Sequence, residues 1–66
     1  MTTHERFIAN AKRLMREQNS CQAGIARAIG TDATHISKIM LASNVTLRTL
    51  DKFAKVFGVE TWELIR

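Results

Sequence analysis

The chain has 66 residues, which limits it to one small domain, and its 45% of apolar residues suffice for one core and exclude a disordered chain. The single cysteine excludes an internal disulfide, and no apolar run or signal-peptide pattern indicates a membrane protein, so we expect a soluble, cytoplasmic chain. Ten Lys and Arg against six Asp and Glu give a net charge of +4, which favours a polyanionic partner such as DNA.

Hydrophobic spacing predicts five helices joined by short turns, the first over residues 4–18 and the second over residues 21–29. In the first, apolar residues at three- and four-residue steps share one face: Phe7, Ile8, Ala11, Leu14 and Met15. Its basic residues lie mostly off that face, where we expect a solvated surface: Arg6, Lys12, Arg13 and Arg16. Asn19 or Ser20 is positioned to cap the second helix, and Gly30 follows its last turn, where a left-handed residue is often needed.

The third predicted helix covers residues 32–41, with Thr31 or Asp32 as its cap and with Ile36 and Ile39 facing the core. Residues 42–45 are predicted to form a loop. A fourth helix over 47–57 is capped by Thr46 and ended by Gly58. Its expected inward positions are Leu47, Leu50, Phe53, Ala54 and Phe57. A short fifth helix over 60–65 is expected to add Trp62 and Ile65 to the core.

Residues 22–39 form the most informative stretch, because two short helices are separated there by a turn of three to four residues containing Gly30. Ala26, four residues before the glycine, is small enough to let the two helices cross closely at a steep angle. Ile36 and Ile39 would hold the second helix onto the first. This spacing predicts a helix-turn-helix, whose second helix stands proud of the body and fits the DNA major groove.

On these residues the chain resembles the phage-repressor and Cro group of helix-turn-helix proteins, the XRE-like family. The family pattern is matched by Gln22, Ile25-Ala26, Gly30, Ile36 and Ile39, followed by Leu50, Phe53-Ala54 and Phe57-Gly58. Trp62 falls where the family often has Trp or Leu, and the similarity covers about residues 7–65 without an evident gap. The resemblance implies a compact, all-α, five-helix lambda-repressor-like DNA-binding domain over residues 1–66, with its helix-turn-helix at about 21–40.

The resemblance also implies which residues would contact DNA. The positions that match base contacts are Asp32, Ala33, Thr34, His35 and Lys38. Those that match phosphate contacts are Gln22, Arg48, Thr31 and Ser37. The chemistry agrees, because Lys38 can donate to guanine O6 and N7, and the methyls of Ala33 and Thr34 suit the thymine methyl. Asp32 can accept from the amino group of cytosine or act only as a helix cap, and both readings stay open.

Arg48 lies near a helix N-terminus, where the helix dipole disfavours a cation unless a phosphate is bound beside it. Two positions depart from the family pattern. Met40 stands where many members have an acidic residue, and Leu41-Ala42 stands where they often have a polar or glycine-containing turn. An exposed Met40-Leu41 pair could instead be buried against a partner subunit.

Two functions follow as hypotheses. The first is a sequence-specific transcriptional regulator, a repressor of the phage or mobile-element kind that binds double-stranded DNA at a palindromic operator as a homodimer, in a bacterial cell or a phage-infected host. The alternative is a protein-interaction module of the same fold (an antitoxin, a cofactor or an anti-repressor), whose important surfaces would be Met40-Leu41 and Trp62-Ile65. Both a whole short protein of the Cro type and the DNA-binding part of a longer protein are compatible with the chain.

We expect no enzyme activity, cofactor, metal or small-molecule ligand. Asp32, His35 and Ser37 would lie on one small helix without a pocket that excludes water. Cys21 has no Cys-x-x-Cys partner, and His4 and His35 are too far apart in the sequence to suggest a metal site.

Overall fold

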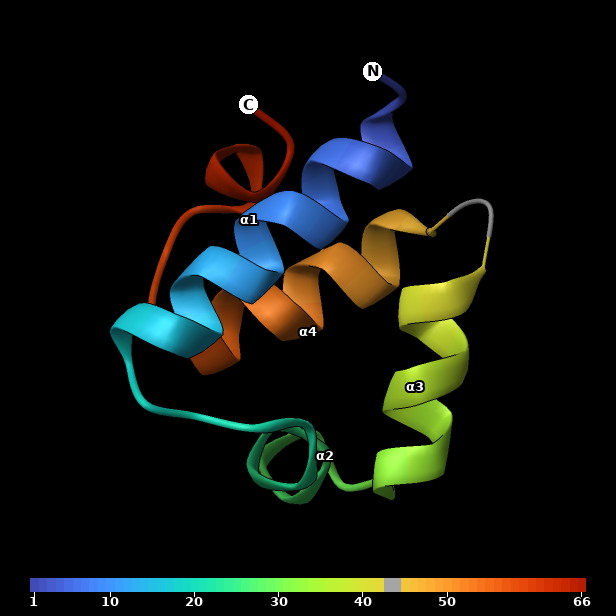
Figure 1. Cartoon of the computed structure of the whole chain (residues 1–66), viewed down its shortest axis with the longest axis vertical. Coiled ribbons are helices and arrows are strands. Elements are labelled where there is room, and N and C mark those ends of the chain that lie inside the picture. Colours follow the sequence, from blue (N-terminus) through green and yellow to red (C-terminus); the bar gives the residue numbers. More distant parts are fainter. Residues whose placement is uncertain (43–44) are drawn as a thin grey trace.

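The structure, a computed structural model, describes residues 1–42 and 45–66, and within them the chain is all-helical (Figure 1). The elements are α1 (Thr3–Glu17), α2 (Gln22–Ile29), α3 (Ala33–Leu41), α4 (Leu47–Phe57) and the 3-10 turn η1 (Thr61–Leu64). The predicted all-α class is confirmed. The predicted fifth α-helix is wrong, because the segment forms one 3-10 turn whose amides bond three residues back, from Glu63 to Glu60 (3.0 Å) and from Ile65 to Trp62 (3.2 Å).

Side-chain caps begin three of the helices, and glycines end two of them. Thr2 and Glu5 form a capping box at α1, and the Asp32 and Thr46 side chains accept the amides of the third helical residue in α3 and α4. Gly30 and Gly58 end α2 and α4 at φ values of 94° and 71°, as predicted.

The predicted cap of α2 by Asn19 or Ser20 is wrong, since the N-cap is Cys21 and its side chain makes no capping hydrogen bond. Asn19 instead turns the chain out of α1. Its φ is 53°, and the amide of Ser20 then bonds to the carbonyl of Met15 at 2.9 Å. This residue therefore serves the end of one helix rather than the start of the next.

One hydrophobic core joins all the elements. Its buried members are Phe7, Ala11, Leu14, Ile25, Ala26, Ile36, Leu50, Phe53, Ala54, Phe57 and Leu64. The rings of Phe7 and Phe53 meet edge to face with centroids 5.1 Å apart, which fixes α1 against α4. His4 is also buried in the first turn of α1 and packs its ring 6.0 Å from that of Phe7, a position that the sequence pattern did not assign to the core.

Two predicted core positions are wrong. Leu47 is 72% exposed and Trp62 is 57% exposed, whereas the fully buried residue of the last element is Leu64. Leu47 is the first residue of α4, and a helical side chain leans toward the N-terminus, so it extends past the core. In η1, the three-residue period of a 3-10 turn replaces the 3.6-residue period assumed from the sequence.

Long-range contacts hold the last element and leave α3 at one side of the molecule. η1 packs on α1 and α4, and Asn10 Nδ2 of α1 donates to the carbonyl of Leu64 at 3.0 Å. α3 packs mainly on α2. The predicted loop at 42–45 includes Ser43 and Asn44, which lie outside the described residues. None of the described helices combines the length and the apolar character needed to cross a membrane.

Candidate functional site

The turn between α2 and α3 controls how α3 is presented. The amides of Gly30 and Thr31 both bond to the carbonyl of Ala26, at 2.9 and 2.8 Å, so that the chain leaves α2 sharply. Ala26 is buried where the two helices meet. Figure 1 shows α2 nearly end-on and α3 side-on, so the two helices cross steeply, as the spacing of residues 22–39 predicts.

The first turn of α3 is held by Asp32. Its Oδ1 atom accepts the amide of His35 at 2.8 Å, which confirms the capping role that the sequence left open. The carboxylate stays exposed, so its second oxygen remains free to accept from another donor.

α3 has one face toward the core and one face toward the outside. Ile36 is fully buried, and Ile39 is half-buried against the core. Thr34 and Lys38 are exposed and lie four residues apart, so they share one outward face, with the exposed Ala33 at its start. This outward face carries three of the five predicted base-contact residues, and all three are exposed.

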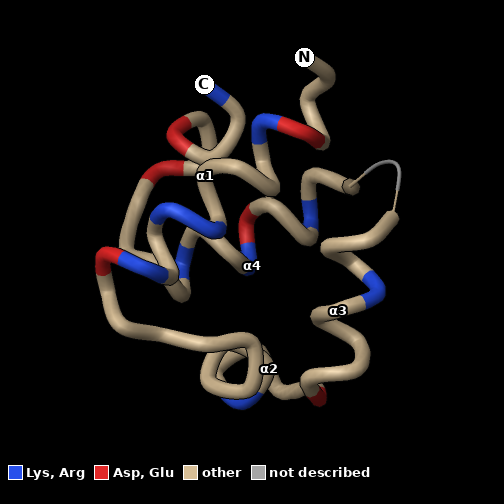
Figure 2. The backbone as a smooth tube through the Cα atoms, viewed as in Figure 1, with Lys and Arg blue, Asp and Glu red and all other residues tan. Residues whose placement is uncertain are grey.

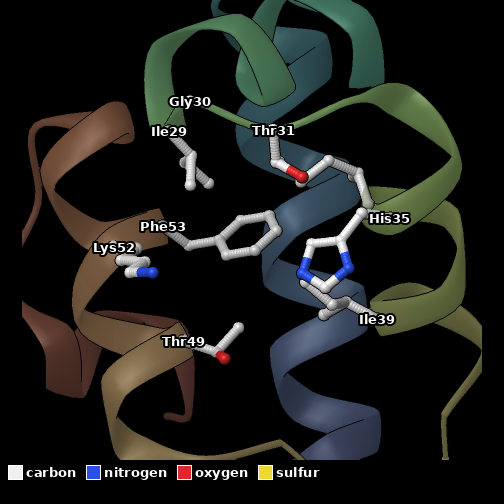
Figure 3. Close-up of a pocket in the computed structure, with 9 residues that line it drawn as sticks. Ile29, Gly30, Thr31, His35, Ile39, Thr49, Lys52 and Phe53 are labelled. Atoms are coloured by element: carbon white, nitrogen blue, oxygen red, sulfur yellow. The ribbon is translucent and has the colours of Figure 1, made fainter.

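Ser37 and His35 leave this outward face on opposite sides of α3. The Ser37 hydroxyl donates to Gln22 Oε1 of α2 at 2.7 Å. The His35 ring instead lines the space between α3 and α4 (Figure 3). The structure thus brings Gln22 and Ser37 together, and it separates His35 from the outward face with which the sequence had grouped it.

The bond from Ser37 orients the Gln22 side chain. Because the amide oxygen accepts from Ser37, the Nε2 donors of Gln22 are left to point elsewhere. Gln22 is the first residue of α2, which begins without a side-chain cap, unlike the other described α-helices. Lys12 of α1 lines the same pocket as Gln22 and Ser37, a hollow of about 250 Å³ that Ile8, Met40 and Leu41 also line. A cation and an amide therefore line one hollow, and both can donate to an anion.

From the sequence, Lys12 was assigned to a solvated face, with a DNA phosphate contact as the less favoured alternative, and nothing in the spacing of α1 distinguishes it from its basic neighbours. Arg13, by contrast, is held by its own helix, since its guanidinium pairs with Glu17 at 3.1 Å. The place of Lys12 in one hollow with Gln22 and Ser37 depends on how α1, α2 and α3 are arranged, which a helical pattern within α1 cannot reveal.

Arg48 is exposed on the first turn of α4 and lines a shallow groove with Asp51, Lys52 and Lys55. The two lysines were missed by the sequence analysis. Their spacing of four and seven residues from Arg48 places all three cations along one side of the helix, and that spacing was a usable signal. Residues 20–58 carry five basic and two acidic residues, while acidic positions lie near both termini (Figure 2).

Among the described residues, no group of three or more His, Cys, Asp or Glu side chains could hold a metal ion. Glu5 lies in the first turn of α1. The backbone N–H of Thr2, and then its hydroxyl, lower the pKa of Glu5. The pKa of Glu5 is thus explained by helix capping.

Comparison of the chain with models of protein families, with curated proteins and with solved structures gives no significant match. Membership of the phage-repressor group therefore stays a prediction. We infer the function from the geometry of α2, α3 and α4 instead.

Proposed function

We propose that the protein is a sequence-specific double-stranded DNA-binding regulator of transcription with a lambda-repressor-like arrangement of helices. The observation that carries the proposal is the outward face of α3. It offers a lysine, a hydroxyl and small methyl groups on a helix that projects beside α2. These are side chains that read base edges in a major groove, and a single helix fits that groove.

Cationic and amide groups flank that face. Lys12 and Gln22 converge on one side of it, and Arg48 lies on the first turn of α4. Side chains of this kind neutralise phosphates and fix the register of a helix on the duplex. They support a division of labour in which α3 reads bases and the neighbouring helices hold the backbone.

The proposal includes a homodimer on an inverted-repeat operator, of the kind used by phage or mobile-element repressors. One nine-residue helix reads only a few base pairs, which gives little discrimination across a genome. Two copies double the footprint, and their α3 helices would enter half-sites about one helical turn apart.

Selection of bound duplexes from a random DNA pool tests this proposal, using the wild-type chain and Lys38→Ala side by side at near-physiological salt. The wild type should enrich an inverted repeat with half-site centres about 10 base pairs apart. Lys38→Ala should lose its preference at one position per half-site and bind about 5- to 150-fold more weakly, the equivalent of about 1–3 kcal/mol.

The matched control is Lys55→Ala, which removes an equally exposed lysine from α4 and should keep every base preference. If a folded wild-type chain enriches no sequence, the regulator proposal is wrong. If Lys38→Ala keeps the full wild-type preference, α3 does not read bases in the register proposed here.

The alternative function, a protein-interaction module of the same fold, is favoured by a different observation. Leu41 is 86% exposed at the end of α3, and Trp62 is more than half exposed on η1. Met40 and Ile65, which were predicted to share these surfaces, are half-buried against the core. Leu41 and Trp62 therefore supply most of the exposed apolar surface of the two predicted interaction pairs. A chain that dimerises or binds a protein but ignores DNA at low salt would support this alternative.

A further inference from the structure

A concave site lies between α3 and α4, on the side of α3 that carries His35 (Figure 3). Its volume is about 200 Å³. Ile29 and Phe53 form part of an apolar floor, and the rim carries Thr31, His35, Thr49 and Lys52. Figure 3 shows the His35 ring and the Thr49 side chain reaching in from opposite sides, with the Phe53 ring between the two helices.

The polar groups on the rim are available to a ligand. Within residues 1–42 and 45–66, the Lys52 ammonium, the His35 ring and the Thr31 hydroxyl make no hydrogen bond or ion pair. The Thr49 hydroxyl accepts from the Thr46 hydroxyl at 3.0 Å, which leaves its own proton to donate into the pocket. The rim therefore presents donors and one fixed positive charge.

The nearby acidic side chains are engaged elsewhere. Asp51 of α4 accepts from the Thr61 hydroxyl at 2.7 Å, which ties it toward η1. One carboxylate oxygen of Asp32 accepts the amide of His35 at the start of α3. Neither carboxylate lines the pocket, so an anion bound there would meet the Lys52 charge without a facing acid.

This chemistry suits one phosphate group. Phosphate oxygens only accept hydrogen bonds, and an ammonium flanked by hydroxyls is a common way for proteins to bind them. The volume is below the range of roughly 300–1,000 Å³ typical of small-molecule pockets, whereas a single phosphodiester needs little depth. The apolar floor would lie under the adjoining sugar.

We propose that the pocket between α3 and α4 seats a DNA backbone phosphate on the strand opposite to the one that Gln22 contacts. This proposal rests on the proposed DNA-binding function. A helix in the major groove has a phosphate backbone on each side of it. Gln22 with Ser37 would hold one backbone, and Lys52 with His35 and Thr49 would hold the other, so that α3 is centred between two strands.

The test uses the duplex recovered by selection, synthesised with one neutral methylphosphonate at a time along both strands of a half-site. Wild-type affinity should fall at phosphates on both strands. Lys52→Gln should reduce the slope of log K against log salt by about one unit. It should also abolish the sensitivity to neutralisation at one phosphate and leave the sensitivity at the phosphate that depends on Gln22.

The control is Arg27→Gln, which removes one exposed positive charge from α2 at a residue that lines neither this pocket nor the groove with Arg48. It should keep the wild-type phosphate profile. Because Lys52 is exposed, its variant should fold, and circular dichroism checks that.

The outcomes separate this proposal from the broader one. If the duplex is bound specifically but Lys52→Gln and Arg27→Gln give the same profile, the pocket proposal is overturned and the regulator function stands. If inorganic phosphate alone shifts the NMR signals of His35 while no methylphosphonate distinguishes the two variants, the site takes a free anion and the DNA proposal for it is wrong. If the folded wild type selects no duplex, both proposals fail together.

Discussion

The hydrogen bond between Ser37 and Gln22 should matter for DNA affinity through orientation. It is a neutral O–H···O bond of 2.7 Å between half-buried side chains, for which a net contribution of about 0.5–1.5 kcal/mol is typical. Removing it by Ser37→Ala frees the Gln22 amide to rotate away from the phosphate. Affinity should therefore fall about 2- to 12-fold, since 1.4 kcal/mol corresponds to a factor of ten. The loss should be equal for all DNA sequences, because phosphate contacts carry no base information.

A double-mutant cycle of Ser37→Ala and Gln22→Ala, read out by fluorescence anisotropy on a labelled duplex, tests this account. If Ser37 acts only through Gln22, Ser37→Ala should add almost nothing to the loss caused by Gln22→Ala, with a coupling energy of at least about 0.5 kcal/mol. If Ser37 reaches a phosphate itself, as the family resemblance implied, the two losses should add. Additivity to within about 0.3 kcal/mol would refute the orienting role.

Three further predictions concern the fold and are read out by urea unfolding. Leu64→Ala should lower the free energy of unfolding by about 2–5 kcal/mol, a large share of the roughly 3–10 kcal/mol expected for a chain of this size. Trp62→Ala should lower it far less, because Trp62 is more than half exposed. The reverse order would contradict the assigned packing. Gly30→Ala should destabilise the fold by about 1–2 kcal/mol, because the φ of Gly30 is 94°. Gly24→Ala lies inside α2 with open space around the new Cβ, so it should stabilise the fold by about 0.5–1 kcal/mol. Two changes of the same sign would contradict the left-handed turn at Gly30. The pKa of Glu5 is lowered in the folded state, so the stabilisation from its carboxylate is present above the pKa of Glu5 in the unfolded chain and is lost as pH falls through its pKa in the folded chain. Wild type should therefore lose more stability in acid than Glu5→Gln does. Parallel curves of stability against pH would contradict the capping interaction.

Helix positions were predictable where a local signal coincided with the apolar period. α4 begins and ends as predicted, because Thr46 before Leu47 and Gly58 after Phe57 bracket a continuous apolar face. Cys21 shows where such signals fail, since nothing in its chemistry marks an N-cap, and the better capping residue Asn19 is used by the preceding helix. Trp62 was misplaced for another reason, because a short segment does not reveal whether its period is 3.0 or 3.6 residues.

The candidate site was predictable only within single elements. The exposure of Thr34 and Lys38 follows from the burial of Ile36 on the same helix. The pairing of Ser37 with Gln22 and the contact of His35 with the α4 side depend on how helices meet, and a one-dimensional period carries no such information. The all-helical class and the exposed face of α3 were thus predictable from the sequence, and the partners of each side chain were not.

The half-exposed Trp62 gives the protein a built-in optical reporter. The chain has one tryptophan and no tyrosine, so its near-ultraviolet fluorescence originates from η1 alone. Figure 1 places η1 beside α1, with α3 across the molecule from it. A partner that covers η1 should shift the emission to shorter wavelength, and dilution should reverse the shift. A duplex bound along α3 should leave the emission wavelength unchanged. The Trp62 emission maximum therefore distinguishes binding at η1 from binding at α3 without any added label.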